Sequence, residues 1–385
     1  MALTVGILAN EFFSPAHTGL GGFGWAATRA LDALRATGDH EVVLLAGAGL
    51  RLDDDVETLH GARVLRLRRP GMAWTSHAAN AAAHLTSGVD VVLSIDYRPT
   101  YLPWFLALPR TPVIVWVRDP RTPDDWDRVR SLRLPGGGDA VAGVDEIETR
   151  SLGRFVRKTR ALRRPVLLAG KMAYLQELVP ATYGLPASEH VLCNPDVVDY
   201  AVTHVAKSDT PRVLFLGRLD PIKRPWLFVA LARQFPEVEF LMLGRRHFEG
   251  AGGWQPTDVP ANVRFLGHVD GQEKLDLLSS AWALVNTSVY EEAPVSVFEA
   301  LAYETPVVAT IDSDRIVERH GVFTGRFDGD GLGALPALAA GLARLLEDAG
   351  LRRRLGAEGR AFVEAHHATP QFLRQFADLC RVTRV

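Results

Sequence analysis

Four charged side chains in the second half of the chain are spaced so that they could act on a phosphorylated compound. Arg218 and Lys223 lie five positions apart. Two cations in one loop suit a diphosphate, whose departure they would assist by stabilising the growing negative charge. Glu291 and Glu299 follow with seven residues between them. Spacing alone fits solvated surface charges equally well, so the elements that carry these residues decide the interpretation.

The two glutamates fall in a predicted unit of strand, loop, helix and strand. Ala281–Ser288 is apolar with small residues, which predicts a buried strand. Apolar residues at helical spacing predict a helix over 295–302, and Pro306–Thr310 is again strand-like. Ligands of parallel α/β sheets bind at the carboxyl ends of the strands. Glu291 is therefore expected in the ligand-facing loop, with Glu299 about two helical turns further on.

The start of this predicted helix is a candidate anion site. Free backbone N–H groups and the helix dipole favour a phosphate there. Pro294 precedes the helix and has no N–H to offer. The amide donors to a phosphate would therefore be those of Val295 and Ser296.

The two cations directly follow another predicted strand. Arg212–Leu216 is apolar, and Gly217–Lys223 (GRLDPIK) forms a strand-to-helix turn after it. This position at the carboxyl end of a strand favours phosphate binding. Lys207–Pro211 is polar and bounded by proline, as is typical of the end of a linker between domains.

The N-terminal region has the same order of strand, glycine-rich loop and helix. Thr4–Ala9 predicts a strand, and the loop after it contains Gly21 and Gly22, which could approach a diphosphate closely. A flexible loop without a ligand is the alternative. A dinucleotide site is less favoured, because no G-x-G-x-x-G follows the strand directly. His17, in this loop, is a candidate acceptor contact or a surface histidine.

Further predicted strands alternate with helical segments, which indicates a parallel, doubly wound sheet. They lie at Glu41–Ala46, Arg63–Leu67, Asp90–Ile95, Pro112–Val117 and Pro165–Ala169 in the first half, and at Glu239–Leu243 and Val263–Leu266 in the second. Arg118 and Asp119 follow one of them. An arginine cannot shuttle a proton, but it can bind a carboxylate or phosphate with two hydrogen bonds. We expect Arg118 to contact an anionic group of a substrate; an Arg118–Asp119 ion pair is the alternative.

A basic stretch lies between two loops and a strand. The segments Pro135–Gly138 and Asp145–Glu148 are expected to be loops. Arg150–Arg164 then carries seven basic residues and no acidic one, together with apolar residues such as Phe155 and Leu162. Such a helix suits a peripheral membrane or an anionic acceptor. A solvated helix face is the simpler interpretation.

The composition points to a globular enzyme with two domains. The chain has 385 residues, 47% of them hydrophobic, and a formal net charge of -2, which gives no support to nucleic-acid binding. The two cysteines, Cys193 and Cys380, fit a reducing compartment. Thr4–Ala9 is too short for a signal peptide, and no apolar run has transmembrane length. A cytoplasmic location is expected, with membrane association left open.

Together these motifs resemble the retaining glycosyltransferases of the GT-B fold, family 4 type. The stretch Glu291–Glu299 resembles their E-x7-E element, and Gly217–Lys223 resembles their Gly-Arg-Leu-x-x-x-Lys motif. Gly21–Gly24 with the helix after it resembles their N-terminal signature. Two departures stand out: residues 291–294 read Glu-Glu-Ala-Pro in place of Glu-Gly-Phe-Gly, and Arg118 stands where the family has histidine.

The resemblance implies two Rossmann-like, doubly wound parallel-sheet domains of the α/β class that face a central cleft. The expected boundaries are 1–205 for an acceptor-side domain and 206–367 for a nucleotide-sugar domain. Residues 368–385 are expected to form a helix that returns to the first domain.

The resemblance also implies an activity and roles for individual residues. A sugar would pass from a UDP- or GDP-linked donor to a hydroxyl acceptor, which could be a glycan, a lipid-linked compound or a small molecule. The anomeric configuration would be retained by front-face substitution. Arg218 and Lys223 would hold the departing diphosphate, Glu291 the sugar hydroxyls and Glu299 the ribose. No metal or cofactor would be needed, because the cations supply the charge. A role in bacterial glycan or glycoconjugate synthesis is typical of such enzymes.

Other donor contacts are implied at Gly217, at His268 near the nucleobase, and at the loop of Gly21 and Gly22. Two alternatives stay open from the sequence. One is another enzyme of this fold, such as a nucleotide-sugar epimerase or a sugar phosphorylase. The other is a catalytically weak binding subunit, suggested by the missing histidine and the glycine-poor loop at Glu291.

Overall fold

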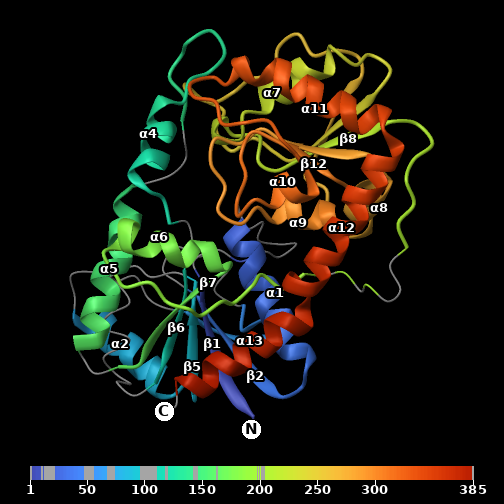
Figure 1. Cartoon of the computed structure of the whole chain (residues 1–385). Coiled ribbons are helices and arrows are strands. Elements are labelled where there is room, and N and C mark those ends of the chain that lie inside the picture. Colours follow the sequence, from blue (N-terminus) through green and yellow to red (C-terminus); the bar gives the residue numbers. More distant parts are fainter. Residues whose placement is uncertain are drawn as a thin grey trace. The chain divides into compact units, whose positions relative to one another are not determined.

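The computed structural model divides into two compact units. It describes residues 2–9, 12, 22–46, 56–66, 74–95, 111–117, 120–141, 146–161, 164–196, 198, 200 and 204–383. The first unit comprises Met1–Thr122, Asp145–Val197 and His367–Val385, and the second comprises Pro123–Val144 and Val198–His366. Figure 1 labels many of the helices and strands of both units.

The first unit is an α/β layer structure around a sheet in the order β3-β4-β2-β1-β5-β6-β7. Its strands are β1 (Leu3–Ala9), β2 (His40–Ala46), β3 (Thr58–Leu59), β4 (Ala62–Arg66), β5 (Val91–Ser94), β6 (Val113–Val117) and β7 (Val166–Gly170). Its helices are α1 (Gly22–Ala36), α2 (Trp74–Leu85), α5 (Glu146–Ala161), α6 (Ala173–Tyr183) and α13 (Thr369–Val382). All neighbouring strands are parallel except β3 and β4.

Helices cover both faces of this sheet, because the strands are apolar on both sides. Ile114 and Trp116 of β6 pack in a cluster with residues of α1 and α13. Val113 and Val115, on the opposite face, pack with residues of α5 and α6. Phe372 of α13 is fully buried in the first of these clusters. The last helix therefore belongs to the first unit, although the segment directly before it, Val198–His366, belongs to the second.

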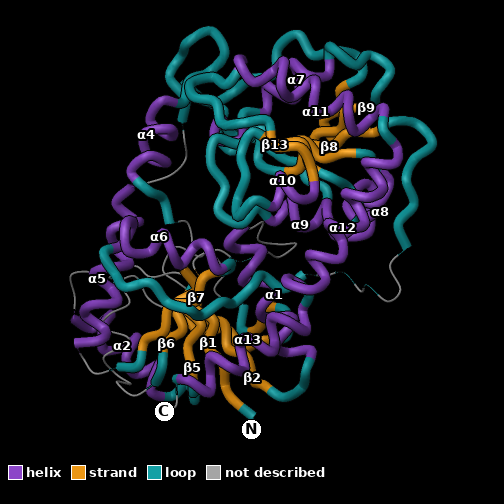
Figure 2. The backbone as a smooth tube through the Cα atoms, viewed as in Figure 1, coloured by secondary structure: helices purple, strands orange, loops and turns teal. Residues whose placement is uncertain are grey.

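The second unit holds a fully parallel sheet in the order β10-β9-β8-β11-β12-β13. Its strands are β8 (Arg212–Leu216), β9 (Glu239–Leu243), β10 (Val263–Gly267), β11 (Ala283–Asn286), β12 (Val307–Ala309) and β13 (Gly321–Phe323). Its helices are α4 (Pro123–Ser131), η2 (Pro221–Lys223), α7 (Pro225–Ala232), α8 (Gly271–Ser280), α9 (Val295–Ala302), α10 (Ile316–His320), η3 (Leu332–Ala334), α11 (Leu335–Glu347) and α12 (Ala349–His367). Figure 2 shows the helices of this unit around its strands. The expected α/β class with two parallel sheets is confirmed, whereas the expected cleft stays a prediction.

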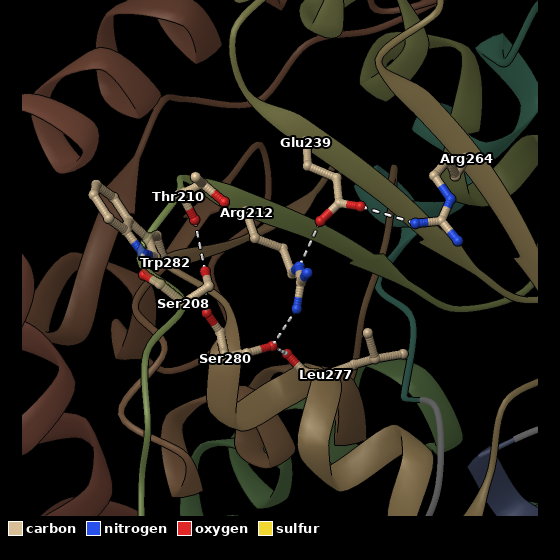
Figure 3. A network of polar contacts seen from close by, with 8 residues as sticks. All are labelled: Ser208, Thr210, Arg212, Glu239, Arg264, Leu277, Ser280 and Trp282. Carbon is tan, nitrogen blue, oxygen red and sulfur yellow. Dashed lines mark hydrogen bonds and ion pairs between the residues drawn. The ribbon is translucent and has the colours of Figure 1, made fainter.

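The amino ends of the second sheet are fixed by a polar network (Figure 3). Arg212, the first residue of β8, donates to Glu239 of β9 at 2.7 Å and to the Ser280 hydroxyl at 2.8 Å. Arg264 of β10 donates to the other oxygen of Glu239 at 3.0 Å. One carboxylate thus joins three neighbouring strands at the end opposite to the loops that carry the predicted motifs.

A segment from the first half of the sequence belongs to the second unit. Residues 123–141 form α4 and a turn, and Trp126, Val129 and Leu132 are buried in the core cluster of the second unit. Arg128 also pairs with Asp328 at 2.7 Å. The expected domain of residues 1–205 is therefore interrupted, because the apolar side of α4 packs among the helices of the second unit.

The expected loops around α4 also have more order than their composition suggested. The glycines of 135–138 lie in a turn closed by hydrogen bonds from Gly137 N–H to Leu134 O and from Leu134 N–H to Gly138 O, at 3.0 and 2.8 Å. Glu146, within the second expected loop, is the first residue of α5.

The basic helix α5 has an exposed charged face and a buried apolar face. Leu152, Phe155 and Val156 are fully buried against the first sheet. Arg154 and Arg157 are exposed on the other side. The apolar face is therefore occupied by the core, so the amphipathic pattern does not provide a surface for insertion into lipid. Within the described residues, no helix has the length and apolar character needed to cross a membrane.

Candidate active site

The candidate site lies at the carboxyl ends of two strands that are neighbours in the second sheet. β8 and β11 pair in parallel, so the loops that follow them leave the sheet side by side. The loop after β8 carries Arg218 and Lys223, and the loop after β11 carries Glu291. The fold thus brings together two motifs that are separated by 68 positions between Lys223 and Glu291.

Lys223 and Glu291 form a direct ion pair. The Lys223 ammonium donates to Glu291 Oε1 at 2.5 Å, and the two side chains are 21% and 11% exposed. The Ser288 hydroxyl donates to the same oxygen at 2.6 Å, and the Asn286 amide donates to it at 3.3 Å. The carboxylate therefore has a defined orientation with three donors on one oxygen.

This environment keeps Glu291 ionised. Burial acts to raise the pKa of the Glu291 carboxyl, but the charge of Lys223 and the hydrogen bonds from Lys223, Ser288 and Asn286 together lower that pKa below its ordinary value. The site consequently holds one positive and one negative charge in close contact.

The loop that carries Lys223 is fixed to the end of β11 by a buried threonine. The Thr287 hydroxyl lies 2.6 Å from the backbone oxygen of Lys223 and 3.0 Å from that of Arg224, and it can donate its single proton to either. The amide of Val289 donates to Ile222 O at 2.9 Å. These bonds hold the two loops in register.

The turn after Lys223 has an unusual backbone. Arg224 adopts a left-handed conformation with φ of 46°, which costs a side-chain-bearing residue free energy. Its guanidinium group is buried and donates to Gly329 O at 3.0 Å. This buried hydrogen bond stabilises the strained turn. The turn in turn fixes the orientation of the Lys223 side chain.

The loop after β12 supports the backbone of Glu291. The Ser313 hydroxyl donates to Glu291 O at 3.1 Å. Asp312 accepts hydrogen bonds from the amides of Val317 and Glu318, both at 2.9 Å, and so caps α10. The loop after β12 therefore helps to position the loop that carries Glu291.

Arg218 has a partner of its own. Its Nη1 lies 3.1 Å from Asp220 Oδ2, and the Asp220 side chain is 1% exposed. Asp220 also accepts a hydrogen bond from the His247 amide at 3.0 Å. Asp220 thus ties the loop after β8 to the loop after β9 and directs Arg218, which keeps 31% exposure.

Gly217 and Gly244 have structural tasks in the same two loops. The Gly217 amide donates to Leu243 O at 3.0 Å, and the expected contact of Gly217 with the donor stays a prediction. A Cβ atom at Gly244 would lie 1.8 Å from Gly217 O. Only glycine fits this approach between the two strand ends.

The start of α9 is partly exposed, and the expected anion site there stays a prediction. Val295, Ser296 and Glu299 are its partly exposed residues, whereas the rest of the helix is buried. The first amides of a helix have no partner within it, so those of Val295 and Ser296 are suited to an oxygen of a phosphate. Glu299 lies one turn along the same face, where Lys274 donates to it at 2.9 Å.

Two further expected residues belong to the part of the chain that the structure describes. His268 is exposed just after β10, and Gly22 is exposed as the first residue of α1 in the first unit. Gly21, His17, Arg118 and Asp119 lie outside the described residues. Their expected contacts with donor or acceptor stay predictions.

Several residues of the site were missed by the sequence analysis. Asn286, Thr287 and Ser288 stand at the end of a predicted strand, and no motif includes Lys274. Three consecutive polar residues at the carboxyl end of an apolar strand were the signal that could have identified the first group. No sequence signal distinguishes Lys274, because its partner comes from another helix.

The fold and this site define a class of protein. Two units with parallel sheets are the arrangement found in solved glycosyltransferases of the GT-B fold, to which the chain is similar. Residues 200–362 match the family described as glycosyl transferases group 1. The expected resemblance to this family and the expected enzyme class are thereby confirmed, whereas the family 4 type and the retaining mechanism stay predictions. No sequence among curated proteins matches the chain.

Solved structures resemble the chain over nearly its whole length. Sucrose-phosphate synthase from Thermosynechococcus elongatus has 19% sequence identity and a TM-score of 0.69, with 98% of each chain covered. Anabaena HepE, in complex with UDP and glucose, has 16% identity and a TM-score of 0.67, covering 98% of this chain and 99% of that one. WaaG, a glycosyltransferase of lipopolysaccharide biosynthesis, has 13% identity and a TM-score of 0.63, covering 98% and 99%. At these identities the likeness concerns the fold.

Proposed function

We propose that the chain transfers a sugar from a nucleotide-sugar donor to a hydroxyl acceptor, with retention of the anomeric configuration and without a metal ion. The observation that carries the proposal is the Lys223–Glu291 pair at the carboxyl ends of β8 and β11. It unites a cation for the leaving diphosphate with a carboxylate for the sugar hydroxyls in one place.

The charges of the site suit the departure of a diphosphate. Lys223 is partly exposed, so its ammonium can contact a phosphate oxygen while Ser288 and Asn286 continue to hold Glu291. Arg218, directed by Asp220, supplies a second cation from the same loop. Negative charge that grows on the diphosphate as the glycosidic bond breaks is then stabilised by groups that are already in position.

Retention needs no pair of carboxylates on opposite sides of the sugar. Within the cluster, Glu291 is fixed beside the cations and is suited to orient hydroxyl groups as a hydrogen-bond acceptor. The acceptor hydroxyl would attack from the side that the diphosphate leaves, and a phosphate oxygen would take its proton. This front-face course assigns no nucleophilic role to Glu291.

A similar fold binds a ligand of the proposed kind. Anabaena HepE has been crystallised with UDP-glucose, and its structure covers 99% of this chain with a TM-score of 0.67. This supports UDP as the first nucleotide to test, with GDP as the main alternative.

Thermal unfolding with nucleotides tests the donor site. UDP, GDP, ADP and dTDP would each be added with magnesium and with a chelator. A ligand at one hundred times its Kd stabilises the folded state by about 2.7 kcal/mol. A rise in Tm with one nucleotide, equal in both conditions, is expected. A rise that requires magnesium would contradict the metal-independent mechanism, and no rise with any nucleotide would contradict the donor site.

Product analysis separates a transferase from the other enzymes of this fold. The nucleotide sugar that stabilises the protein would be incubated with and without candidate hydroxyl acceptors, and the anomeric configuration of the product read by NMR. We expect release of nucleotide that depends on acceptor, with the donor configuration kept. Conversion of the donor without acceptor would favour an epimerase, and dependence on inorganic phosphate would favour a phosphorylase.

We also propose an anionic surface or acceptor as a partner of α5. Its exposed residues include Arg154, Arg157, Lys158 and Arg160, and the contact would be electrostatic because the apolar face is buried. Sedimentation with vesicles of phosphatidylcholine, with and without phosphatidylserine, tests it. Binding that needs the anionic lipid and weakens with salt is expected. Equal sedimentation of a variant with Arg154→Glu and Arg157→Glu would contradict the proposal.

A further inference from the structure

The second glutamate of the site, Glu299, has a partner that the sequence did not indicate. Lys274 of α8 donates from its ammonium nitrogen to Glu299 Oε1 of α9 at 2.9 Å. The two side chains are 9% and 15% exposed. An ammonium group with so little water around it depends on an opposite charge, because its own solvation has been lost.

The position of Lys274 on its helix is consistent with a specific task. Lys274 and Leu278 are the buried residues of α8, one turn apart, so the lysine lies on the side that packs into the unit. On α9, Glu299 shares its partly exposed face with Val295 and Ser296, the amide donors of the candidate phosphate site. The lysine therefore meets the glutamate from the protein side, and the Glu299 side chain keeps 15% exposure.

We infer that Lys274 is a positioning residue for recognition of the ribose of the donor nucleotide. It fixes one oxygen of Glu299, so that Oε2 and the remaining lone pair of Oε1 face the ribose hydroxyls in a defined direction. The inference rests on the proposed function, in which Glu299 receives a nucleoside diphosphate. It adds that selectivity for ribose over 2′-deoxyribose depends on a residue of another helix.

The physical reason is the freedom of a glutamate side chain. The Glu299 side chain has three rotatable bonds. Without Lys274, its carboxylate would lose this conformational freedom only when a ligand binds, and binding would bear the entropy cost. A carboxylate held in advance loses less entropy on binding, and it favours the ligand that offers hydroxyl donors along its open lone pairs. A 2′-deoxyribose lacks one of those donors, so it gains less from the fixed carboxylate.

The test compares matched ribo- and deoxyribonucleotides in calorimetric titrations. UDP and 2′-deoxy-UDP, GDP and 2′-deoxy-GDP, and ADP and 2′-deoxy-ADP would be titrated into the whole chain. The pair whose ribonucleotide binds is used for the variants. The wild type is expected to prefer the ribonucleotide by about tenfold or more, the worth of a hydrogen bond to a charged group. Lys274→Met should reduce the preference to about threefold or less, chiefly through weaker binding of the ribonucleotide.

Two further variants separate positioning from general support of the fold. Lys274→Arg keeps a cation and should retain most of the preference. In a background of Glu299→Gln, the Lys274→Met change should have no further effect on the ratio, because the lysine acts through the glutamate. If Lys274→Met does not fold by circular dichroism, Lys274→Gln repeats the test with a polar group in the buried position.

The outcomes distinguish this inference from the proposed function. An unchanged ribose preference in Lys274→Met would overturn the inference and leave the donor site intact. An effect of equal size with Glu299→Gln present would also overturn it, since Lys274 would then act independently. If no nucleoside diphosphate binds the wild type, the proposed function and the inference both fail.

Discussion

At the residue scale, the site is built from charges whose orientation depends on neutral hydroxyl and amide groups. The proposed function assigns the chemistry to Lys223 and Glu291. Ser288 and Asn286 fix the carboxylate, and Thr287 fixes the loop backbone. Hydrogen bonds to a charged group are roughly twice as strong as those between neutral groups. Substitution of Ser288, Asn286 or Thr287 should therefore lower the catalytic rate more than it lowers the stability of the fold.

Lys223→Ala should reduce turnover by about two orders of magnitude or more, because a preformed cation at the leaving group is removed. Initial rates with saturating nucleotide sugar measure the effect. Arg353→Ala, at an exposed position of α12, is the control and should leave the rate unchanged. Near-normal turnover of the Lys223 variant would refute its assignment.

Glu291 should make the stability of the second unit depend on acidic pH. Its pKa is lower in the folded protein than its ordinary value of 4.5. Such a group stabilises the fold above the unfolded pKa, and this contribution is lost as the pH falls through the folded pKa. The relevant window therefore lies below pH 4.5.

The measurement compares the free energy of unfolding of the wild type and Glu291→Gln across that window. We expect the advantage of the wild type to shrink as the pH falls. Glu364→Gln, at an exposed position of α12, serves as the control. Parallel curves for wild type and Glu291→Gln would show that the ion pair with Lys223 does not persist in solution.

At the element scale, the notable feature is that α4 leaves the first half of the sequence to pack in the second unit. Its apolar side enters the core, and its charged side pairs twice with the loop that precedes η3. Arg128 lies 2.7 Å from Asp328, and Arg326 lies 3.7 Å from Asp125. The same loop accepts the hydrogen bond of the buried Arg224 through Gly329. Helix α4 thus supports, through one intermediate loop, the turn that carries Lys223.

Trp126→Ala should destabilise the second unit by about 3–5 kcal/mol, the usual cost of removing a buried aromatic side chain. Trp126 is 7% exposed and lies in the core cluster of that unit. Denaturant unfolding followed by circular dichroism avoids the loss of a fluorescent probe. Arg130→Ala, on the exposed side of α4, is the control and should change the stability by less than about 1 kcal/mol. A similarly small effect of Trp126→Ala would mean that α4 is not anchored in the second unit.

At the scale of the whole molecule, the chain crosses between the two units several times. The first unit is completed only when α13, at the end of the chain, packs with α1 and β6. Both cysteines lie in this unit and are buried. Burial, and next the negative charge of Asp196, raise the pKa of the Cys193 thiol to about 12.

The two thiols should therefore be inert in the native protein and report opening of the first unit. A thiol is nucleophilic as the thiolate, which Cys193 does not form near neutral pH. We expect slow reaction with a chromogenic disulfide in buffer and two rapid equivalents per chain in denaturant. Rapid reaction in buffer would contradict the close packing of α13. A Cys380→Ser variant assigns the remaining signal to Cys193.

The sequence by itself determined the α/β class, most strands and the main motifs. Continuous apolar runs such as Val113–Val117 identify strands that are buried on both faces, and Gly217–Lys223 could be placed at a strand end by its position after such a run. Short elements were not predicted from the sequence. Examples are β13 and the helix α4, which has few apolar residues. Their structure depends on neighbours more than on local preference.

Only the tertiary structure decided which of the motif residues meet. The order of the strands puts β8 beside β11 and so joins Lys223 to Glu291, and the packing of α8 on α9 joins Lys274 to Glu299. The tertiary structure also shows that the apolar face of α5 is buried in the core, whereas its amphipathic pattern alone favoured membrane binding. A pattern along the chain records which side of an element is apolar. What covers that side, and which charge meets which, follows from contacts between distant segments.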